Sequence, residues 1–264
     1  MLTAVKNQLR VLLLSIKYNI MREMTNRITF LTNISFMVLN NATFIVQWLL
    51  LFHLRPNIGG YGFDNIMLLW GLAASTFGFS HALFQGAFQL PSFIQQGKLD
   101  PFLVQPKNVL LGVITSQTNS SAIGDFIYGY LVVIIFCFSP ANLILFTLFS
   151  LSGGLVITAF AVITGSFSFW IIKGELLSEN LNNMLINFTT YPDSIFKSGV
   201  RLLLYTLVPV GFVVYNPLHI MLEFNFPILL ATFAFTFAIC LLAILLFYRG
   251  LRRYTSSSLR SARI

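Results

Sequence analysis

Three titratable side chains, those of His81, Asp125 and Glu179, fall within segments that could cross a membrane: the first two in long uncharged stretches, and Glu179 in a shorter and more polar one. Ionisable groups are costly to bury in a membrane, and where they occur they often mark proton or ion pathways. Together they could serve a secondary transporter or a channel. Two of them also have a structural interpretation: a neutral His81 hydrogen-bonded between helices, and an Asp125 near the lipid headgroups at a helix N-terminus.

Motifs for catalysis are missing from the sequence. It contains no Gly-x-x-x-x-Gly-Lys-Ser/Thr phosphate loop, no His-Glu-x-x-His and no Gly-x-Ser-x-Gly. Cys137 and Cys240 lie far apart in apolar runs, which predicts packing residues and neither a disulfide nor a metal site. We therefore expect no catalytic activity and no bound cofactor in this chain.

A polar segment broken by prolines, residues 95–106, separates two long apolar runs. Its prolines restrict the backbone, and Asp100, directly before a proline, is biased away from continuing a helix. The short element 101–104 could therefore act as a rigid lever, with Phe102 and Leu103 filling a groove on another protein. The alternative is an ordinary loop between two helices, capped by Asp100.

Composition indicates the class of protein in which these residues lie. Hydrophobic residues make up 56% of the chain and charged residues 9%, whereas soluble domains carry about 25% charged residues. At about 20 apolar residues per helical span, the chain can form five or six spans but no large soluble domain. The net charge is +8, and basic residues beside the spans explain it. We therefore expect the chain to lie in a lipid bilayer and not to bind nucleic acid.

Apolar runs and their breaks predict an all-α membrane protein with six transmembrane helices in one domain. An amphipathic helix at 1–26 is expected to lie in the membrane interface. The other elements are spans at 28–54, 64–88, 122–138, 142–172, 175–191 and 226–248, a cytoplasmic loop at 89–111, an external or re-entrant region at 193–225 and a basic tail at 249–264.

The fifth span has two possible positions. Glu179, Asn183 and Asn187 recur every four residues, so the helix 175–191 either lines a polar cavity or lies on the cytoplasmic surface. The next apolar piece, 202–215, contains a proline and is short for a span, which suits a re-entrant segment. In the other assignment, 173–197 is cytoplasmic and 198–220 is the fifth span; both give six crossings.

Basic residues predict the orientation. With the first assignment, only Arg55, Lys197 and Arg201 of the 16 Lys and Arg residues fall outside. Because cytoplasmic loops carry the excess of basic residues, both termini and the segment 95–106 are expected on the cytoplasmic side.

A face of small residues is predicted on the second span. Ala74, Gly78, Ala82 and Gly86 recur every four positions, which lets another helix approach closely. The neighbour could belong to the same chain or to a second copy.

The proline-broken segment resembles the cytoplasmic loop of type-2 ATP-binding-cassette permeases, in a subgroup whose loop reads Gly-x-Leu-Asp-x-x-Leu-x-x-Pro. The matching residues are Gly97, Leu99, Asp100, Leu103 and Pro106. Further short motifs match the layout of the same subgroup: Phe169-Trp170, Tyr191-Pro192, Ile195-Phe196, Pro209-Val210-Gly211 and Asn216-Pro217.

This resemblance implies a permease subunit of an ATP-driven exporter in the cell membrane. A second permease, identical or closely related, would share the pathway, and separate ATPase subunits would bind ATP and Mg. Glu179, Asn183 and Asn187 would line the pathway. The residues implied in coupling to the ATPase are Gly97, Leu99, Asp100, Pro101, Phe102, Leu103 and Pro106, and those implied in an external gate are Tyr191, Pro192, Pro209, Asn216 and Pro217.

The rival function is a secondary transporter or channel that uses His81, Asp125 and Glu179. That class often shows inverted repeats with paired broken helices, and the two halves of this sequence contain no convincing repeat.

Overall fold

The computed structural model describes residues 2–255, so the distal part of the expected basic tail, with Arg260 and Arg263, lies outside the described residues. Within residues 2–255 the structure is helical, with turns, one isolated bridge between Ile58 and Tyr61, and no strand. This confirms the all-α class that the sequence predicts.

The helices follow the apolar runs of the sequence closely. The α-helices are α1 (Leu2–Glu23), α2 (Arg27–Leu54), α3 (Phe63–Phe84), α4 (Leu90–Gln95), α5 (Asp100–Leu103), α6 (Val109–Ile114), α7 (Ser120–Phe136), α8 (Pro140–Ser166), α9 (Gly174–Thr189), α10 (Ser198–Thr206), α11 (Asn216–Leu222) and α12 (Phe226–Leu251). Three 3-10 turns, η1 (Gln85–Ala87), η2 (Phe167–Phe169) and η3 (Asp193–Ile195), and a π-helix, η4 (Gly211–Tyr215), lie between them.

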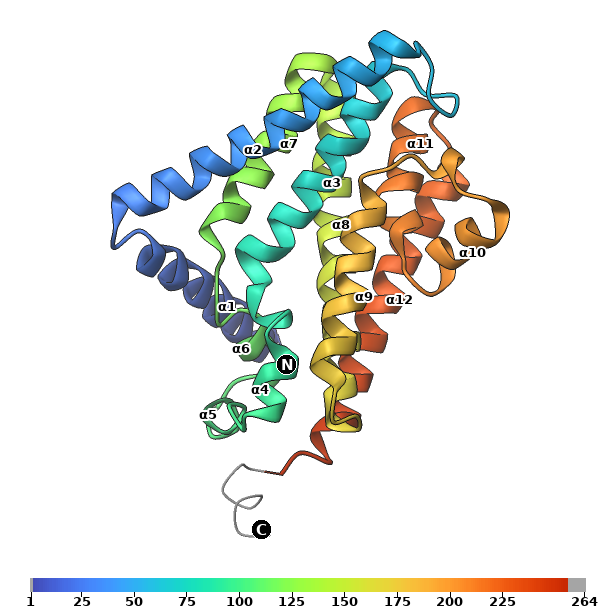
Figure 1. The fold of residues 1–264 in the computed structure, drawn as a ribbon. Helices are drawn as coiled ribbons and strands as arrows, with labels where there is room; N and C mark the ends of the chain where they lie inside the picture. Colours follow the sequence, from blue (N-terminus) through green and yellow to red (C-terminus); the bar gives the residue numbers. More distant parts are fainter. Residues whose placement is uncertain (1, 256–264) are drawn as a thin grey trace.

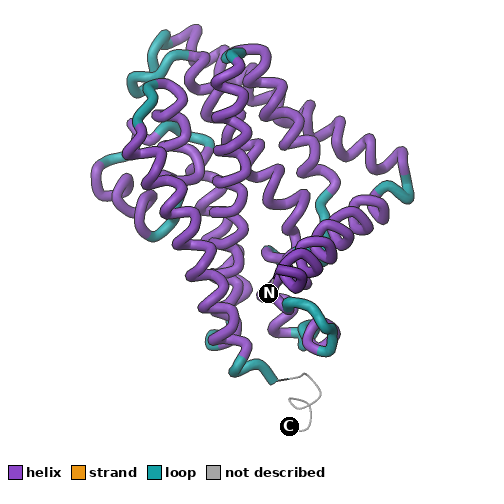
Figure 2. Tube along the Cα trace, turned by 180° about the vertical axis from the view of Figure 1, so that it is seen from behind, coloured by secondary structure: helices purple, strands orange, loops and turns teal. Residues whose placement is uncertain are grey.

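Long helices run lengthwise between two ends of the molecule. Helices α4, α5 and α6, the start of α1 and the end of α12 gather at one end, which we call the loop end (Figure 1). The α2–α3 loop and α11 lie at the other, the far end, and α10 lies at the side of the bundle between the two ends (Figure 1). Helix α3 packs on α7 and α8, and α8 packs on α9 and α12. Helices α1 and α2 form a V that projects from this bundle (Figure 2).

Four helices in the described part are long and apolar enough to cross a membrane. They are α2, α3 continued to Gln95, α8 continued to Phe169, and α12; α10 and α11 together would supply a fifth if the bent pair is one span. Helix α7 has 17 residues and α9 has 16. The structure thus supports a multi-pass membrane protein, and the count of six spans stays a prediction.

Gly78, one of the predicted small residues, lies against α7 of the same chain. A Cβ atom on Gly78 would lie 2.7 Å from the carbonyl oxygen of Ala122, and one on Gly129 would lie 2.6 Å from the carbonyl oxygen of Gly71. Such distances leave no room for a side chain, so glycine lets the two backbones touch. The sequence alone leaves open whether the closely packed helix belongs to the same chain or to a second copy. In the structure it belongs to the same chain.

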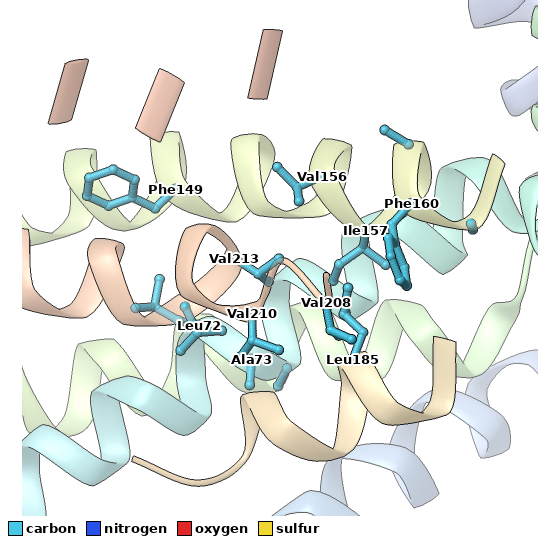
Figure 3. Close-up of a cluster of buried hydrophobic side chains, with 14 of the residues drawn as sticks. Leu72, Ala73, Phe149, Val156, Ile157, Phe160, Leu185, Val208, Val210 and Val213 are labelled. Atoms are coloured by element: carbon cyan, nitrogen blue, oxygen red, sulfur yellow. The ribbon is translucent and has the colours of Figure 1, made fainter. Parts of the chain in front are cut away.

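The segment between α10 and α11 is a buried break in the helical structure. Helices α10 and the continuous piece Gly211–Leu222 meet at 84°. The apolar residues at the break, Val208, Val210 and Val213, are at most 1% exposed. Figure 3 shows them among side chains of α3, α8 and α9, including Leu72, Ala73, Ile157 and Leu185.

Helix α1 is attached to α6 by polar contacts. Ser15 Oγ and Asn19 Nδ2 donate to the carbonyl oxygen of Thr115 at 3.0 and 2.6 Å. Apolar side chains such as Leu13 and Tyr18 remain exposed. A helix with one face on protein and apolar groups exposed fits the predicted interfacial position, which stays a prediction.

Candidate functional site

Local chemistry explains the shape of the loop between α4 and α6. Gly97 has φ of +71°, and the N–H of Lys98 donates to the carbonyl oxygen of Phe93 at 2.9 Å, which ends α4 as glycine commonly ends a helix. Leu99 is completely buried and anchors the chain. Helix α5 then follows as a single turn with a proline at its start.

The exposed side chains of this loop are not quite those that the sequence singled out. Phe102 is half-buried and stacks on Phe93, with ring centroids 6.1 Å apart. Leu103 is 41% exposed and Val104 is 84% exposed. Leu103 therefore lies where a partner could reach it, Phe102 supports it from within, and Val104, which the motif does not include, joins the exposed apolar surface.

A long-range contact connects this loop to the end of the chain's last long helix. The hydroxyl of Tyr254 donates to Asp100 Oδ1 at 2.9 Å. Burial and this hydrogen bond raise the pKa of Tyr254 to about 12, so the hydroxyl keeps its proton at neutral pH. Asp100 thus accepts a tertiary hydrogen bond, a role beyond capping its own loop.

The predicted polar stripe of α9 borders a cavity of about 330 Å³ near the loop end. Glu175, Glu179 and Asn183 line it from α9, and His81 lines it from α3. The His81 ring lies between Phe77 and Phe88, with centroid distances of 3.8 Å to each. The structure brings Glu179, Asn183 and His81 together; Asn187, one turn further along, is exposed but does not line this cavity.

Polar contacts with α8 fix the rotation of α9. Asn182 Nδ2 donates to Thr164 Oγ1 at 3.1 Å, and the hydroxyls of Thr164 and Ser178 lie 3.0 Å apart. All three residues are buried. This contact fixes the rotation that turns Glu179 and Asn183 toward the cavity, which Ser178 and Asn182 line as well. Sequence reasoning missed it, although the fourfold spacing of Ser178 and Asn182 is a usable signal.

Asp125 lines a second cavity, of about 180 Å³, with Asn41 and Ile186. It is 4% exposed, and its Oδ1 accepts a hydrogen bond from Asn41 Nδ2 at 2.6 Å. The side chain is buried between α2 and α7, in the second turn of α7; its position at the depth of the lipid headgroups stays a prediction. Ile186 lines the first cavity as well, so the two cavities are adjacent along α9.

A third cavity, of about 360 Å³, lies at the far end. Tyr191 and Pro192 line it together with Trp48 of α2. The remaining residues predicted for an external gate lie in the broken segment: Pro209 and Pro217 are buried, and Asn216 Nδ2 lies 3.5 Å from Thr232 Oγ1. The predicted gate residues therefore form two groups, one on the cavity and one inside the bundle.

A polar cluster at the far end, which sequence reasoning missed, attaches the α2–α3 loop to the broken segment. Tyr61 donates its hydroxyl hydrogen to Asp193 Oδ1 at 2.8 Å. His219 Nε2 and Arg201 Nε lie 3.5 and 3.8 Å from Asp193 Oδ2. Burial alone would raise the pKa of Asp193, but hydrogen bonds from His219 and Tyr61 and the charges of His219 and Arg201 outweigh it, so the pKa lies below its ordinary value.

Asp193→Asn is expected to destabilise the protein by about 1.5–3 kcal/mol, the usual worth of hydrogen bonds to a charged group. Because the pKa of Asp193 is lower in the folded protein, its contribution is present above the ordinary value of 3.8 and is lost as the pH falls below it. Thermal unfolding of the purified protein between pH 7 and pH 3 should therefore show a shallower acid loss in the variant. Glu223→Gln removes an exposed carboxylate from the same end, and equal acid profiles for both variants would contradict the role of Asp193.

Comparison with known proteins gives one family. Residues 38–258 match the family model of an ABC-2 family transporter protein. This range includes the loop between α4 and α6, helix α9, the two cavities that α9 lines, and the broken segment between α10 and α11. No curated protein and no solved structure matches the sequence.

Proposed function

The chain belongs to the ABC-2 family of transporter proteins, as a membrane permease, and on this premise we propose that it forms the pathway of an ATP-driven exporter together with a second permease. Permeases of this family are transport components and not themselves ATPases, and they normally work with ATP-binding-cassette ATPase partners. The second permease would be identical or closely related. ATP and Mg would be bound by the ATPase subunits.

Coupling through the loop between α4 and α6 is supported by its geometry. A single helical turn, α5, is fixed by buried Leu99 and half-buried Phe102, while Leu103 and Val104 are exposed. Exposed apolar side chains on a rigid turn suit a groove on another protein, since little conformational entropy is lost on docking. This is the observation that carries the proposal. Gly97, Asp100, Pro101 and Pro106 would hold the turn in place.

A pathway beside α9 is supported by the row of cavities. Glu179 and Asn183 border the first cavity, and Ile186 lines both the first and the second. Asn187 extends the same stripe. In this proposal α9 is the fifth of six crossings, and substrate moves along its polar side between the two permeases.

A re-entrant outer gate is supported by the buried break between α10 and α11. An 84° bend, with Val208, Val210 and Val213 at most 1% exposed around it, does not suit one straight span at 198–220. Irregular backbone at membrane depth is tolerated where protein buries it. Tyr191, Pro192, Pro209, Asn216 and Pro217 would together control the outer end.

The proposed location is the cell membrane, with both termini and the loop between α4 and α6 in the cytoplasm. The basic residues support this orientation. If the broken segment lies outside, only three of the 16 Lys and Arg residues are on the outer side, and the excess of basic residues belongs to the cytoplasmic side. Under it, the loop end is cytoplasmic and the far end external.

Affinity purification of the intact chain from its own cells tests the proposal. We expect an ATP-binding-cassette ATPase to purify with it, and the complex to hydrolyse ATP in proteoliposomes at a rate that falls when the permease is left out. A chain that purifies alone and moves ions or solutes without ATP would exclude the exporter and would favour the secondary transporter or channel that uses His81, Asp125 and Glu179.

A further inference from the structure

The second cavity contains an incompletely paired carboxylate. Asp125 is 4% exposed, and only its Oδ1 is bonded, to Asn41. Its Oδ2 is buried and accepts no hydrogen bond from any residue in the range 2–255. A carboxylate in an apolar bundle is costly unless a positive charge or further hydrogen bonds accompany it. The site therefore lacks a partner that donates to this oxygen.

Three of the ten residues that line this cavity are aromatic. Phe44 stacks on Trp70 with ring centroids 4.2 Å apart, and Phe77 lines the cavity beside them. The faces of aromatic rings attract cations, tryptophan most strongly, and they do so best when the cation is dehydrated. Aromatic faces beside a carboxylate are the usual surroundings of ammonium groups that carry apolar substituents.

The approach to this cavity is also acidic. Glu175 and Glu179 line the first cavity, and Ile186 is shared by both. No Lys or Arg of the described part lines either one, although the chain has 16 basic residues against 8 acidic ones. An anionic substrate would meet only like charges on this path.

We infer that the cavity between α2, α3, α7 and α9 binds an organic cation, with the Asp125 carboxylate facing its ammonium group and Phe44, Trp70 and Phe77 contacting its apolar substituents. The inference rests on the proposed function in one respect: the cavity lies on the proposed pathway, so the cation is the class of substrate. Binding itself needs neither the ATPase nor a second permease.

Choline and 3,3-dimethylbutan-1-ol are suitable probes, because they have the same shape and only choline is charged. Equilibrium dialysis against the purified chain in neutral detergent should show saturable binding of choline and binding of the alcohol that is at least about tenfold weaker, a difference of about 1.4 kcal/mol. Asp125→Asn should reduce the affinity for choline to that for the alcohol. Asp64→Asn removes a carboxylate of α3 that does not line the cavity, and it should leave choline binding unchanged.

Phe44→Leu provides a second variant if Asp125→Asn does not fold, and it should weaken choline binding while leaving the alcohol nearly unaffected. Three results would each overturn the inference: no saturable choline binding, equal affinity for the two probes, or unchanged choline binding in Asp125→Asn. Any of these can occur in a chain that still purifies with its ATPase, so failure of the cation site is distinct from failure of the proposed exporter.

Discussion

Leu103→Asp is expected to abolish the stimulation of ATP hydrolysis by this chain while leaving its insertion into the membrane intact. Leu103 is 41% exposed on α5, next to Val104 at 84%, so the change costs little in the free permease. In a docked complex the new carboxylate would be buried without a partner, which costs about 3–5 kcal/mol and, at about 1.4 kcal/mol per factor of ten, weakens binding by two orders of magnitude or more. The measurement is ATP hydrolysis by the reconstituted ATPase at increasing permease concentration.

Two further variants make the Leu103 experiment specific to the exposed apolar surface. Val104→Asp should have a comparable effect, because that side chain is the more exposed of the two. Gln96→Glu adds the same negative charge at an exposed position of the same loop, and it should change hydrolysis little. Normal stimulation by Leu103→Asp, or equal loss in Gln96→Glu, would show that this surface does not dock on the ATPase as proposed.

The parts of the fold that the sequence predicts are those set by local chemistry. Hydropathy alone places α2, α3, α8 and α12, because each apolar run is long enough to be recognised without knowledge of its neighbours. The loop is equally local: Gly97 with positive φ ends α4, and a proline begins α5.

The parts that the sequence does not predict depend on rotation and on distant contacts. A one-turn helix has no periodicity, so the pattern cannot tell that Phe102 faces Phe93 and that Val104 is exposed. The hydrogen bond of Asp125 to Asn41 could not be predicted, because the two residues lie 84 positions apart. The cluster around Asp193 likewise joins Tyr61 to His219, 158 residues apart.

In α9, local pattern and distant contact combine to define the proposed route. Fourfold spacing places Glu179 and Asn183 on one side of the helix, and the contact of Asn182 with Thr164 decides which side faces the bundle. The same rotation places Ile186 where it lines both cavities. The side chain at this position should therefore control passage from one cavity to the other.

In the proposed pathway, Ile186→Trp is expected to obstruct passage between the cavities, because Ile186 lines both and the larger indole would extend into them. Passage can be measured without knowing the substrate, by the rate at which a cationic methanethiosulfonate reagent modifies a thiol introduced by Ala74→Cys. Ala74 lines the second cavity only, and Cys137 and Cys240 would first be replaced by serine. We expect Ile186→Trp to slow this modification by about tenfold or more, which corresponds to a barrier increase of about 1.4 kcal/mol.

Matched controls separate a closed connection from a general distortion of α9. A thiol introduced by Asn183→Cys lines the first cavity only, so Ile186→Trp should leave its modification rate nearly unchanged. Met184→Trp adds the same indole at an exposed position of α9 that borders neither cavity, and it should not slow the reaction at position 74. Ile186→Ala should accelerate it. If Ile186→Trp leaves the modification at position 74 as fast as before, the second cavity is reached by another route, and the proposed pathway along α9 would have to be abandoned.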